Sequence, residues 1–166
     1  HDGGGTTIVC LTLKRAPLGQ ILVVCTGNTC RSPMAAAFLK ILMDGRGFSG
    51  RVFSAGLCTV NGLPASPLAI LAMKEQGIDL SQHRSRQVDL SLVEGSNHVV
   101  GITMRHVDEL LEQFPEQSSR IRRFPLPDIA DPYGSNLDSY RIIRDLLHAW
   151  SCTLLDYIGG DPWVTG

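Results

Sequence analysis

The chain has 166 residues, of which 43% are hydrophobic and 19% are charged, and its formal net charge is −1. This composition predicts one globular domain with its own core, and the near-neutral charge excludes the basic footprint typical of a nucleic-acid-binding protein. No apolar run reaches the about 18–20 residues that span a bilayer, so we expect no membrane association.

The apolar pattern alternates between strands and helices along the chain. Short runs with β-branched residues predict strands at 20–25, 51–56, 97–104 and 120–124. A helical face begins after the first strand, with Ser32 as its cap, Pro33 in its first turn and Gly45 at its end. Further helices are predicted at 66–77, after the third strand up to Pro115, and along the last part of the chain.

Strands that alternate with helices indicate βαβ units and a mostly parallel sheet. In such sheets, ligands bind beyond the carboxyl ends of the strands. Two polar stretches follow predicted strands, namely "CTGNTCRS" (25–32) and "DIADPYG" (128–134). We therefore expect these two stretches to meet at one edge of the sheet.

The stretch 25–32 has the form C-x5-R-S between a strand and a helix. The backbone amides from Thr26 to Arg31 can curl around an anion, and the Arg31 guanidinium fits two oxygens of a phosphate-like group. The groups that hold an oxyanion also stabilise a Cys25 thiolate, to which Ser32 can donate a hydrogen bond. A thiolate at the floor of a phosphate cradle is suited to attack on phosphorus. The alternative is a buried core cysteine beside a surface arginine.

A phosphocysteine intermediate requires a proton donor for the leaving group and later a base for water. The stretch 128–134 offers Asp128 and Asp131, with Pro132 stiffening the loop and Tyr133 available as an aromatic wall. Taken by itself, Asp-Pro-Tyr-Gly is more typical of a simple turn. Its functional interpretation depends on its occurrence in the same chain as the cysteine cradle.

These two motifs together resemble the low-molecular-weight protein phosphatase family, in particular the protein-arginine phosphatases in the loop "CTGNTCRS". The likeness runs from about Ile21 to Tyr157 and includes "SAG" (54–56), "GID" (77–79) and "HRSRQ" (83–87). The resemblance implies an α/β, flavodoxin-like three-layer sandwich with a four-stranded parallel sheet flanked by helices. It implies no metal and no cofactor. The expected partners are phosphorylated proteins, and inorganic phosphate or other oxyanions should bind the loop.

The same resemblance assigns a role to each matching residue. Cys25 is the expected nucleophile, Arg31 binds phosphate, and Asp131 acts first as general acid and then as base. The expected substrate-binding positions share the cradle and its rim, and are Thr26, Gly27, Asn28, Thr29, Cys30, Ser32 and Tyr133. Ser54 and His83 are expected to support the loop, although a surface histidine is the alternative for His83.

Two positions in the loop extend this interpretation. Cys30 lies five residues after Cys25, as in many family members, and a curled loop can bring both sulfurs within disulfide range. Thr29 stands where tyrosine-specific relatives usually carry a bulky aliphatic residue, and resembles the arginine phosphatases. The loop thus favours phosphoarginine as substrate, with phosphotyrosine as the alternative. A packed thiol is the alternative for Cys30.

Other interpretations belong to different functional classes. Arsenate reductases of similar fold also use a C-x5-R cradle, but they need a relay of further cysteines, and there is none between Cys58 and Cys152. A non-catalytic phosphate-binding module would not need both Cys25 and Asp131. Five cysteines at irregular spacing also argue against a secreted disulfide framework and a structural zinc site, so we expect a cytoplasmic protein.

The expected phosphatase domain covers residues 20–160, followed by a tail at 161–166. Residues 1–19 have no counterpart in the family and are expected to be an extension or linker. An added edge strand over "TTIVCLTL" and the remnant of an upstream domain remain open for this stretch.

Overall fold

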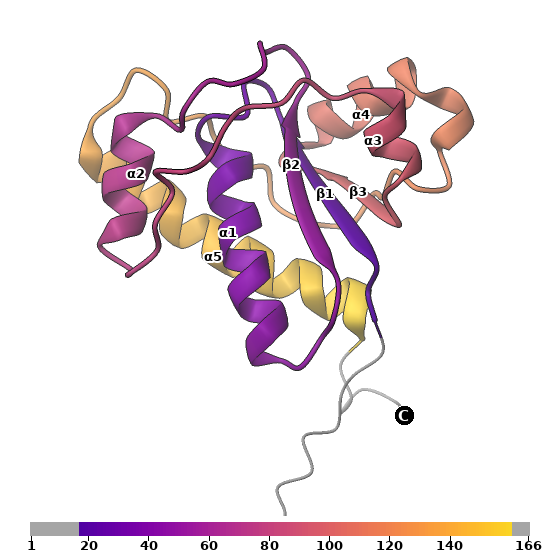
Figure 1. Ribbon diagram of the computed structural model, residues 1–166, viewed down its shortest axis with the longest axis horizontal. Coiled ribbons are helices and arrows are strands. Elements are labelled where there is room, and N and C mark those ends of the chain that lie inside the picture. Colours follow the sequence, from indigo (N-terminus) through magenta and orange to yellow (C-terminus); the bar gives the residue numbers. More distant parts are fainter. Residues whose placement is uncertain (1–16, 161–166) are drawn as a thin grey trace, which may run out of the picture.

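The computed structural model describes residues 17–160, in which a parallel sheet lies between two groups of helices (Figure 1). Within these residues the sheet has three strands in the order β2–β1–β3, formed by Gln20–Cys25 (β1), Arg51–Gly56 (β2) and His98–Gly101 (β3). Both pairings of β1 are parallel. Most of the extension and all of the tail expected from the sequence, residues 1–16 and 161–166, lie outside the described residues.

The helices cover both faces of the sheet. The bounds are Arg31–Gly45 (α1), Pro67–Lys74 (α2), Leu90–Glu94 (α3), Met104–Gln113 (α4) and Leu137–Gly159 (α5), with a short 3₁₀ turn at Pro115–Gln117. Helices α1, α2 and α5 lie on one side of the sheet, and α3 and α4 lie on the other (Figure 1). Helix α3 was not predicted, because its single turn is too short to produce a helical period.

The central strand β1 is buried on both faces. Ile21, Val23 and Cys25 point into the core beneath α1 and α5, whereas Leu22 and Val24 point into the smaller core beneath α3 and α4. This follows from the alternation of side chains along a strand. The segment that follows β1 therefore begins from the most rigid part of the sheet.

The expected four-stranded sheet is corrected to three strands in the described part of the chain. Residues 120–124 form a single parallel bridge, in which the Val99 N–H donates to Arg120 O at 2.8 Å and the Arg122 N–H donates to Val99 O at 2.8 Å. The Leu126 N–H then donates to Phe124 O at 2.8 Å, so the chain turns at Pro125 and leaves the sheet. The pairing consequently stops after one bridge.

The expected cap of the first helix was also wrong. Helix α1 begins two residues earlier than expected, at Arg31, with Cys30 in place of Ser32 as its N-cap and no side-chain hydrogen bond at that position. Ser32 is fully buried and its hydroxyl contacts other residues, described below. The Ser32 side chain therefore contacts residues of the loop and does not cap the helix.

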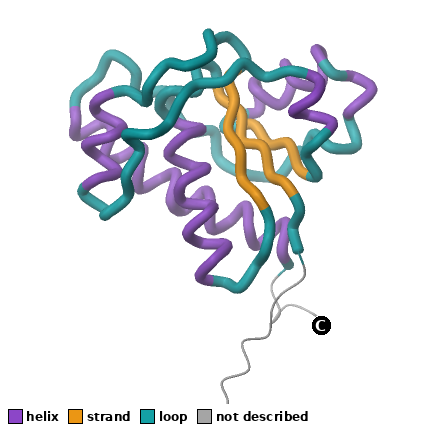
Figure 2. The backbone as a smooth tube through the Cα atoms, viewed as in Figure 1, coloured by secondary structure: helices purple, strands orange, loops and turns teal. Residues whose placement is uncertain are grey.

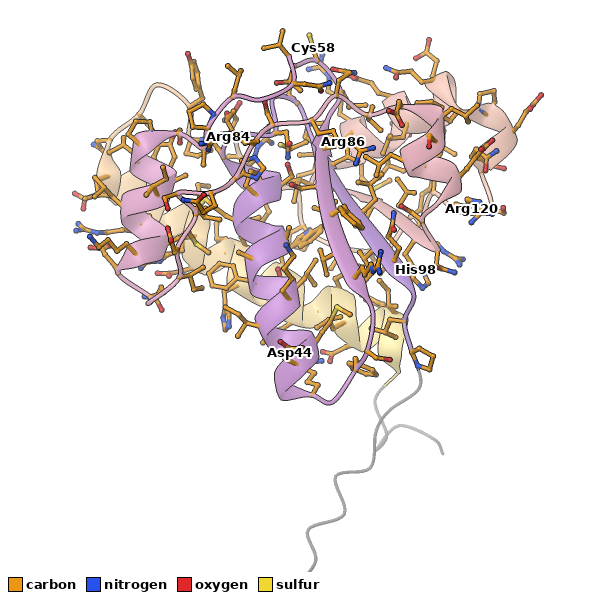
Figure 3. The ribbon with its side chains drawn as sticks, viewed as in Figure 1. Asp44, Cys58, Arg84, Arg86, His98 and Arg120 are labelled. Carbon is orange, nitrogen blue, oxygen red and sulfur yellow. The ribbon has the colours of Figure 1, made fainter. Side chains whose placement is uncertain are left out.

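Loops gather at the edge where all three strands end (Figure 2). Cys58, Arg84 and Arg86 lie at this edge, and Asp44 lies at the opposite end of the molecule (Figure 3). Gly56, the last residue of β2, packs directly against the segment after β1. A Cβ atom on Gly56 would lie 2.7 Å from Thr26 O and 3.1 Å from the carbonyl carbon of Gly27.

We predict that Gly56→Ala lowers the free energy of unfolding by about 1–3 kcal/mol, because the new methyl group must displace backbone and not a flexible side chain. Urea denaturation measures this difference. Gly45→Ala is the matched control, since a Cβ at Gly45 meets nothing within 4 Å. It should leave stability unchanged or raise it by about 0.4–1 kcal/mol. Equal stability of the two variants would contradict the close contact at Gly56.

Candidate active site

The segment between β1 and α1 is held in an unusual backbone conformation by Asn28. This residue has a φ of 55°, which side chains other than glycine rarely adopt, and it is fully buried. Its Nδ2 donates to Ser32 Oγ at 2.8 Å and to Ser54 Oγ at 2.9 Å, while its Oδ1 accepts from the Arg86 N–H at 2.9 Å. All polar atoms of the Asn28 side chain are therefore paired.

His83 supports the same residue from outside the loop. Its Nε2 lies 2.7 Å from Asn28 O, and because a carbonyl can only accept, Nε2 carries the proton and donates it. Burial, as the largest cause, lowers the pKa of His83 below its usual value. The histidine is thus a neutral donor to the loop and not a surface residue, and the structure brings Ser54 and His83 together at Asn28.

Cys25 lies at the start of the loop, with its side chain almost completely buried. Its Sγ is 2.9 Å from Ser32 Oγ. Ser32 Oγ accepts from Asn28 Nδ2, and its own proton has two possible acceptors, Cys25 Sγ at 2.9 Å and Ala55 O at the longer distance of 3.5 Å. The structure thus places a hydroxyl directly against the sulfur of Cys25.

Arg31 connects the loop to the second predicted motif. Its Nη1 donates to Ile129 O at 2.9 Å, and its Nη2 lies 3.6 Å from Asp131 Oδ2. Arg31 is 6% exposed, whereas the Asp131 side chain is 50% exposed. The two stretches that the sequence analysis expected to meet do so, although about 100 residues separate them.

The two candidate acids differ in their partners. Asp128 Oδ1 accepts from the Met104 N–H, the first of α4, at 2.9 Å. Asp131 Oδ1 accepts from the Tyr133 N–H at 3.0 Å, and its other oxygen faces Arg31. Tyr133 itself is 78% exposed. Asp128 therefore stabilises the N-terminus of α4, whereas Asp131 Oδ2 lies next to the guanidinium of Arg31.

An open cleft of about 530 Å³ lies between these elements, lined among others by Thr26, Arg31, His106, Asp128 and Asp131. Its polar groups come from the ends of different strands, as expected at this edge of a parallel sheet. Gly27 is partly exposed next to Thr26. No group of three or more His, Cys, Asp or Glu that could hold a metal ion occurs among residues 17–160. Nor does any helix of this described part have the length and apolarity to cross a membrane.

Cys30 and Thr29 make side-chain contacts to residues other than Cys25. Cys30 Sγ lies 3.3 Å from both Ser66 Oγ and Tyr140 OH, inside the core. Thr29 is partly exposed, and its Oγ1 lies 3.8 Å from Cys30 Sγ. Cys25, Cys30, Cys58 and Cys152 are all free thiols.

Sequence reasoning missed His106, whose Nε2 lies 3.0 Å from Thr26 Oγ1. It also missed the pair of hydroxyls on Ser66 and Tyr140 that contact Cys30. A signal for His106 was present, because Thr103 and His106 have the three-residue spacing of a capping box directly after a strand at this edge. Ser66 and Tyr140 gave none, since their contact depends on how α2 packs against α5.

Comparisons with known proteins agree with this geometry. Residues 20–161 match the family model described as low molecular weight phosphotyrosine protein phosphatase. The chain is 40% identical over 144 residues to a protein-arginine-phosphatase of Geobacillus stearothermophilus, covering 82% of this chain and 91% of that one. It is 34% identical over 147 residues to EpsP of Ralstonia nicotianae, a probable low molecular weight protein-tyrosine-phosphatase, covering 87% and 92%.

A solved structure extends the likeness to the fold. The YwlE arginine phosphatase, in a variant with a phosphorylated active-site serine, superposes with a TM-score of 0.80 at 31% identity, covering 86% of this chain and 97% of that one. A family model that spans nearly all described residues, and relatives that share the fold along their length, leave one assignment: the chain belongs to the low-molecular-weight phosphotyrosine protein phosphatase family.

Proposed function

We propose that this phosphatase hydrolyses phosphorylated protein side chains through a phosphocysteine on Cys25, and that phosphoarginine is its preferred substrate. The observation that carries the proposal is the meeting of the two motifs, with Arg31 Nη2 3.6 Å from Asp131 Oδ2 at the loop that begins with Cys25. The strand order β2–β1–β3, extended by the bridge at Ile121, supports the flavodoxin-like arrangement that this family implies.

In the first step, the Cys25 thiolate forms an S–P bond while the bond from phosphorus to the leaving oxygen or nitrogen breaks. Asp131 donates its proton to the leaving group. In the second step, Asp131 takes a proton from water, the water oxygen attacks phosphorus, and the S–P bond breaks. Inorganic phosphate leaves and the thiolate is restored. Loop amides and Arg31 hold the phosphoryl oxygens throughout.

Asp131→Asn should slow hydrolysis of phenyl phosphate by about 10²–10⁴-fold and hydrolysis of p-nitrophenyl phosphate far less, because the more acidic phenol leaves without a proton donor. Steady-state kinetics with both esters measures the difference. Asp128→Asn is the matched control, since its side-chain oxygen still accepts from the Met104 N–H. A larger loss in Asp128→Asn, dependent on the leaving group, would transfer the role of general acid to Asp128.

Thr29 supports the preference for phosphoarginine. Its hydroxyl lies on a partly exposed part of the loop and makes only the 3.8 Å contact to Cys30 Sγ within the described residues. A guanidinium carries several N–H donors, and donors buried opposite an aliphatic side chain cost about 1–3 kcal/mol each. Threonine offers both an acceptor and more room than isoleucine. Similarity to a named protein-arginine-phosphatase supports the same substrate, and similarity to EpsP keeps phosphotyrosine as the alternative.

We predict that Thr29→Ile lowers kcat/KM for phosphoarginyl peptides and spares or raises it for phosphotyrosyl peptides. Parallel turnover of both peptides by the wild type and the variant tests this directly. Thr29→Ser, which keeps the hydroxyl, is the control and should retain the phosphoarginine preference. If the wild type does not hydrolyse phosphoarginine, or if Thr29→Ile affects both peptides equally, the tyrosine phosphatase interpretation stands.

Cys30 is proposed as the partner of Cys25 in a protective disulfide. Peroxide would oxidise the Cys25 thiolate to a sulfenic acid, and the Cys30 thiol would then displace water to form the S–S bond. Cys30 must exchange its contacts to Ser66 and Tyr140 for that bond. We propose a reducing, cytoplasmic location, because catalysis by Cys25 requires a free thiol.

Peroxide should therefore inactivate the enzyme, and a thiol reductant should restore its activity. Mass spectrometry of the oxidised protein should find a peptide that links Cys25 to Cys30. The control variant Cys58→Ser removes an exposed thiol and should behave like the wild type. A Cys25 sulfinic acid beside a reduced Cys30 would exclude the disulfide.

A further inference from the structure

His106 joins the N-terminus of α4 to the loop after Cys25. It is the third residue of α4 and is 4% exposed. Its Nδ1 accepts from the Thr103 N–H at 3.2 Å, so the ring proton lies on Nε2. Nε2 is 3.0 Å from Thr26 Oγ1 and donates to it. Thr26 directly follows Cys25.

The ring keeps this orientation because it stays neutral. Burial lowers the pKa of His106 to about 4, and the nearby charge of Arg31 acts in the same direction. A protonated ring would have to donate from Nδ1 as well, and could no longer accept from the Thr103 N–H. Near neutral pH, one nitrogen therefore accepts within α4 and the other donates to Thr26.

The same helix N-terminus is held by the loop that carries Asp131. The Met104 N–H donates to Asp128 Oδ1 at 2.9 Å. Ile129 follows Asp128, and its carbonyl accepts from Arg31 Nη1 at 2.9 Å. Arg31 lies at the end of the loop that begins with Cys25. The contacts thus form a closed ring around the cleft, from Thr26 through α4 and residues 128–129 to Arg31.

We infer that His106 and Asp128 are positioning residues. Through the N-terminus of α4, they hold Asp131 at the place from which it can protonate the leaving group while Cys25 attacks phosphorus. This inference rests on the proposed role of Asp131 as general acid. Among the described residues, the bond between His106 and Thr26 is the only hydrogen bond that joins residues 25–31 to α4. Its loss would leave the Asp131 loop attached to the cradle through Arg31 alone.

The expected effect concerns proton transfer more than binding. A general acid must lie within hydrogen-bond reach of the leaving atom, and small displacements reduce its contribution. The oxyanion cradle is held separately by Asn28 and its partners. Breaking the ring of contacts should therefore slow the hydrolysis of esters with poor leaving groups. It should leave the binding of phosphate in the cradle largely unchanged.

The experiment compares kcat for p-nitrophenyl phosphate with kcat for phenyl phosphate in two variants. His106→Phe keeps an aromatic ring but removes both nitrogens, and Thr26→Val removes only the acceptor and leaves α4 untouched. Thr103→Val is the control for loss of the helix cap: it removes the hydroxyl that accepts from the His106 N–H and lies 3.0 Å from His106 Nδ1, but it keeps the backbone N–H that donates to Nδ1 and the bond from Nε2 to Thr26. Each variant is made in the wild-type background and in the Asp131→Asn background.

In the wild-type background, the ratio of the two kcat values should rise about tenfold in His106→Phe and in Thr26→Val. It should not change in Thr103→Val, although that variant melts at a lower temperature. In the Asp131→Asn background neither variant should raise the ratio further, because the acid is already absent.

An unchanged ratio in Thr26→Val, or a further rise in the Asp131→Asn background, would overturn the inference. Thr26→Val decides the question even if His106→Phe does not fold. If Asp131→Asn itself leaves the ratio unchanged, the proposed role of Asp131 is wrong and the inference falls with it. If Asp131→Asn raises the ratio and Thr26→Val does not, only the inference is wrong.

Discussion

The left-handed backbone of Asn28 is the constraint on which the rest of the site depends. For an L-residue other than glycine this conformation costs about 1–2 kcal/mol. Asn28 makes three side-chain hydrogen bonds and accepts a fourth at its carbonyl from His83. At a net of about 0.5–1.5 kcal/mol each, these bonds outweigh the backbone cost. A left-handed residue in a turn can direct successive N–H groups towards one point, which is what an oxyanion needs.

The partners of Asn28 come from distant parts of the chain, so the loop has its shape only in the folded protein. Ser54 lies on β2, and His83 and Arg86 lie in the segment after α2. Because β1 is buried on both faces, the loop begins from a fixed point, and β2 and the segment after α2 close around it. The conformation of residues 25–32 consequently depends on the stability of the folded sheet.

Two histidines that remain uncharged support the cysteine loop, His106 at the cleft and His83 outside it. His83 is partly buried and His106 is buried, and burial lowers the pKa of each. Each then donates a single N–H, to Asn28 O and to Thr26 Oγ1 respectively. A positive ring beside Arg31 would add repulsion between cations and remove the acceptor that orients the ring. The histidines thus act as neutral supports, and Arg31 provides the buried positive charge for a phosphoryl group.

The sequence by itself determined the local elements and the chemistry of two short stretches. Periodicity predicted β1, β2, β3 and the long helices, and the spacing of Cys25 and Arg31 indicated an oxyanion cradle, because these signals depend on neighbours in the chain. It failed at residues 120–124, where the segment RIRRF resembles a short strand but the chain turns at Pro125 after one bridge. It also assigned to Ser32 a capping role that its hydroxyl does not perform.

Only the tertiary structure decided which candidates share contacts. That His83 supports Asn28, that Asp128 contacts α4 while Asp131 faces Arg31, and that His106 reaches Thr26 all follow from elements brought together across the end of the sheet. Tautomer and charge of a histidine depend on burial and on the atoms opposite each nitrogen, and neither is encoded in its neighbours along the chain. Residue types and spacing set the chemistry that is available, and packing of distant elements sets the geometry in which it can act.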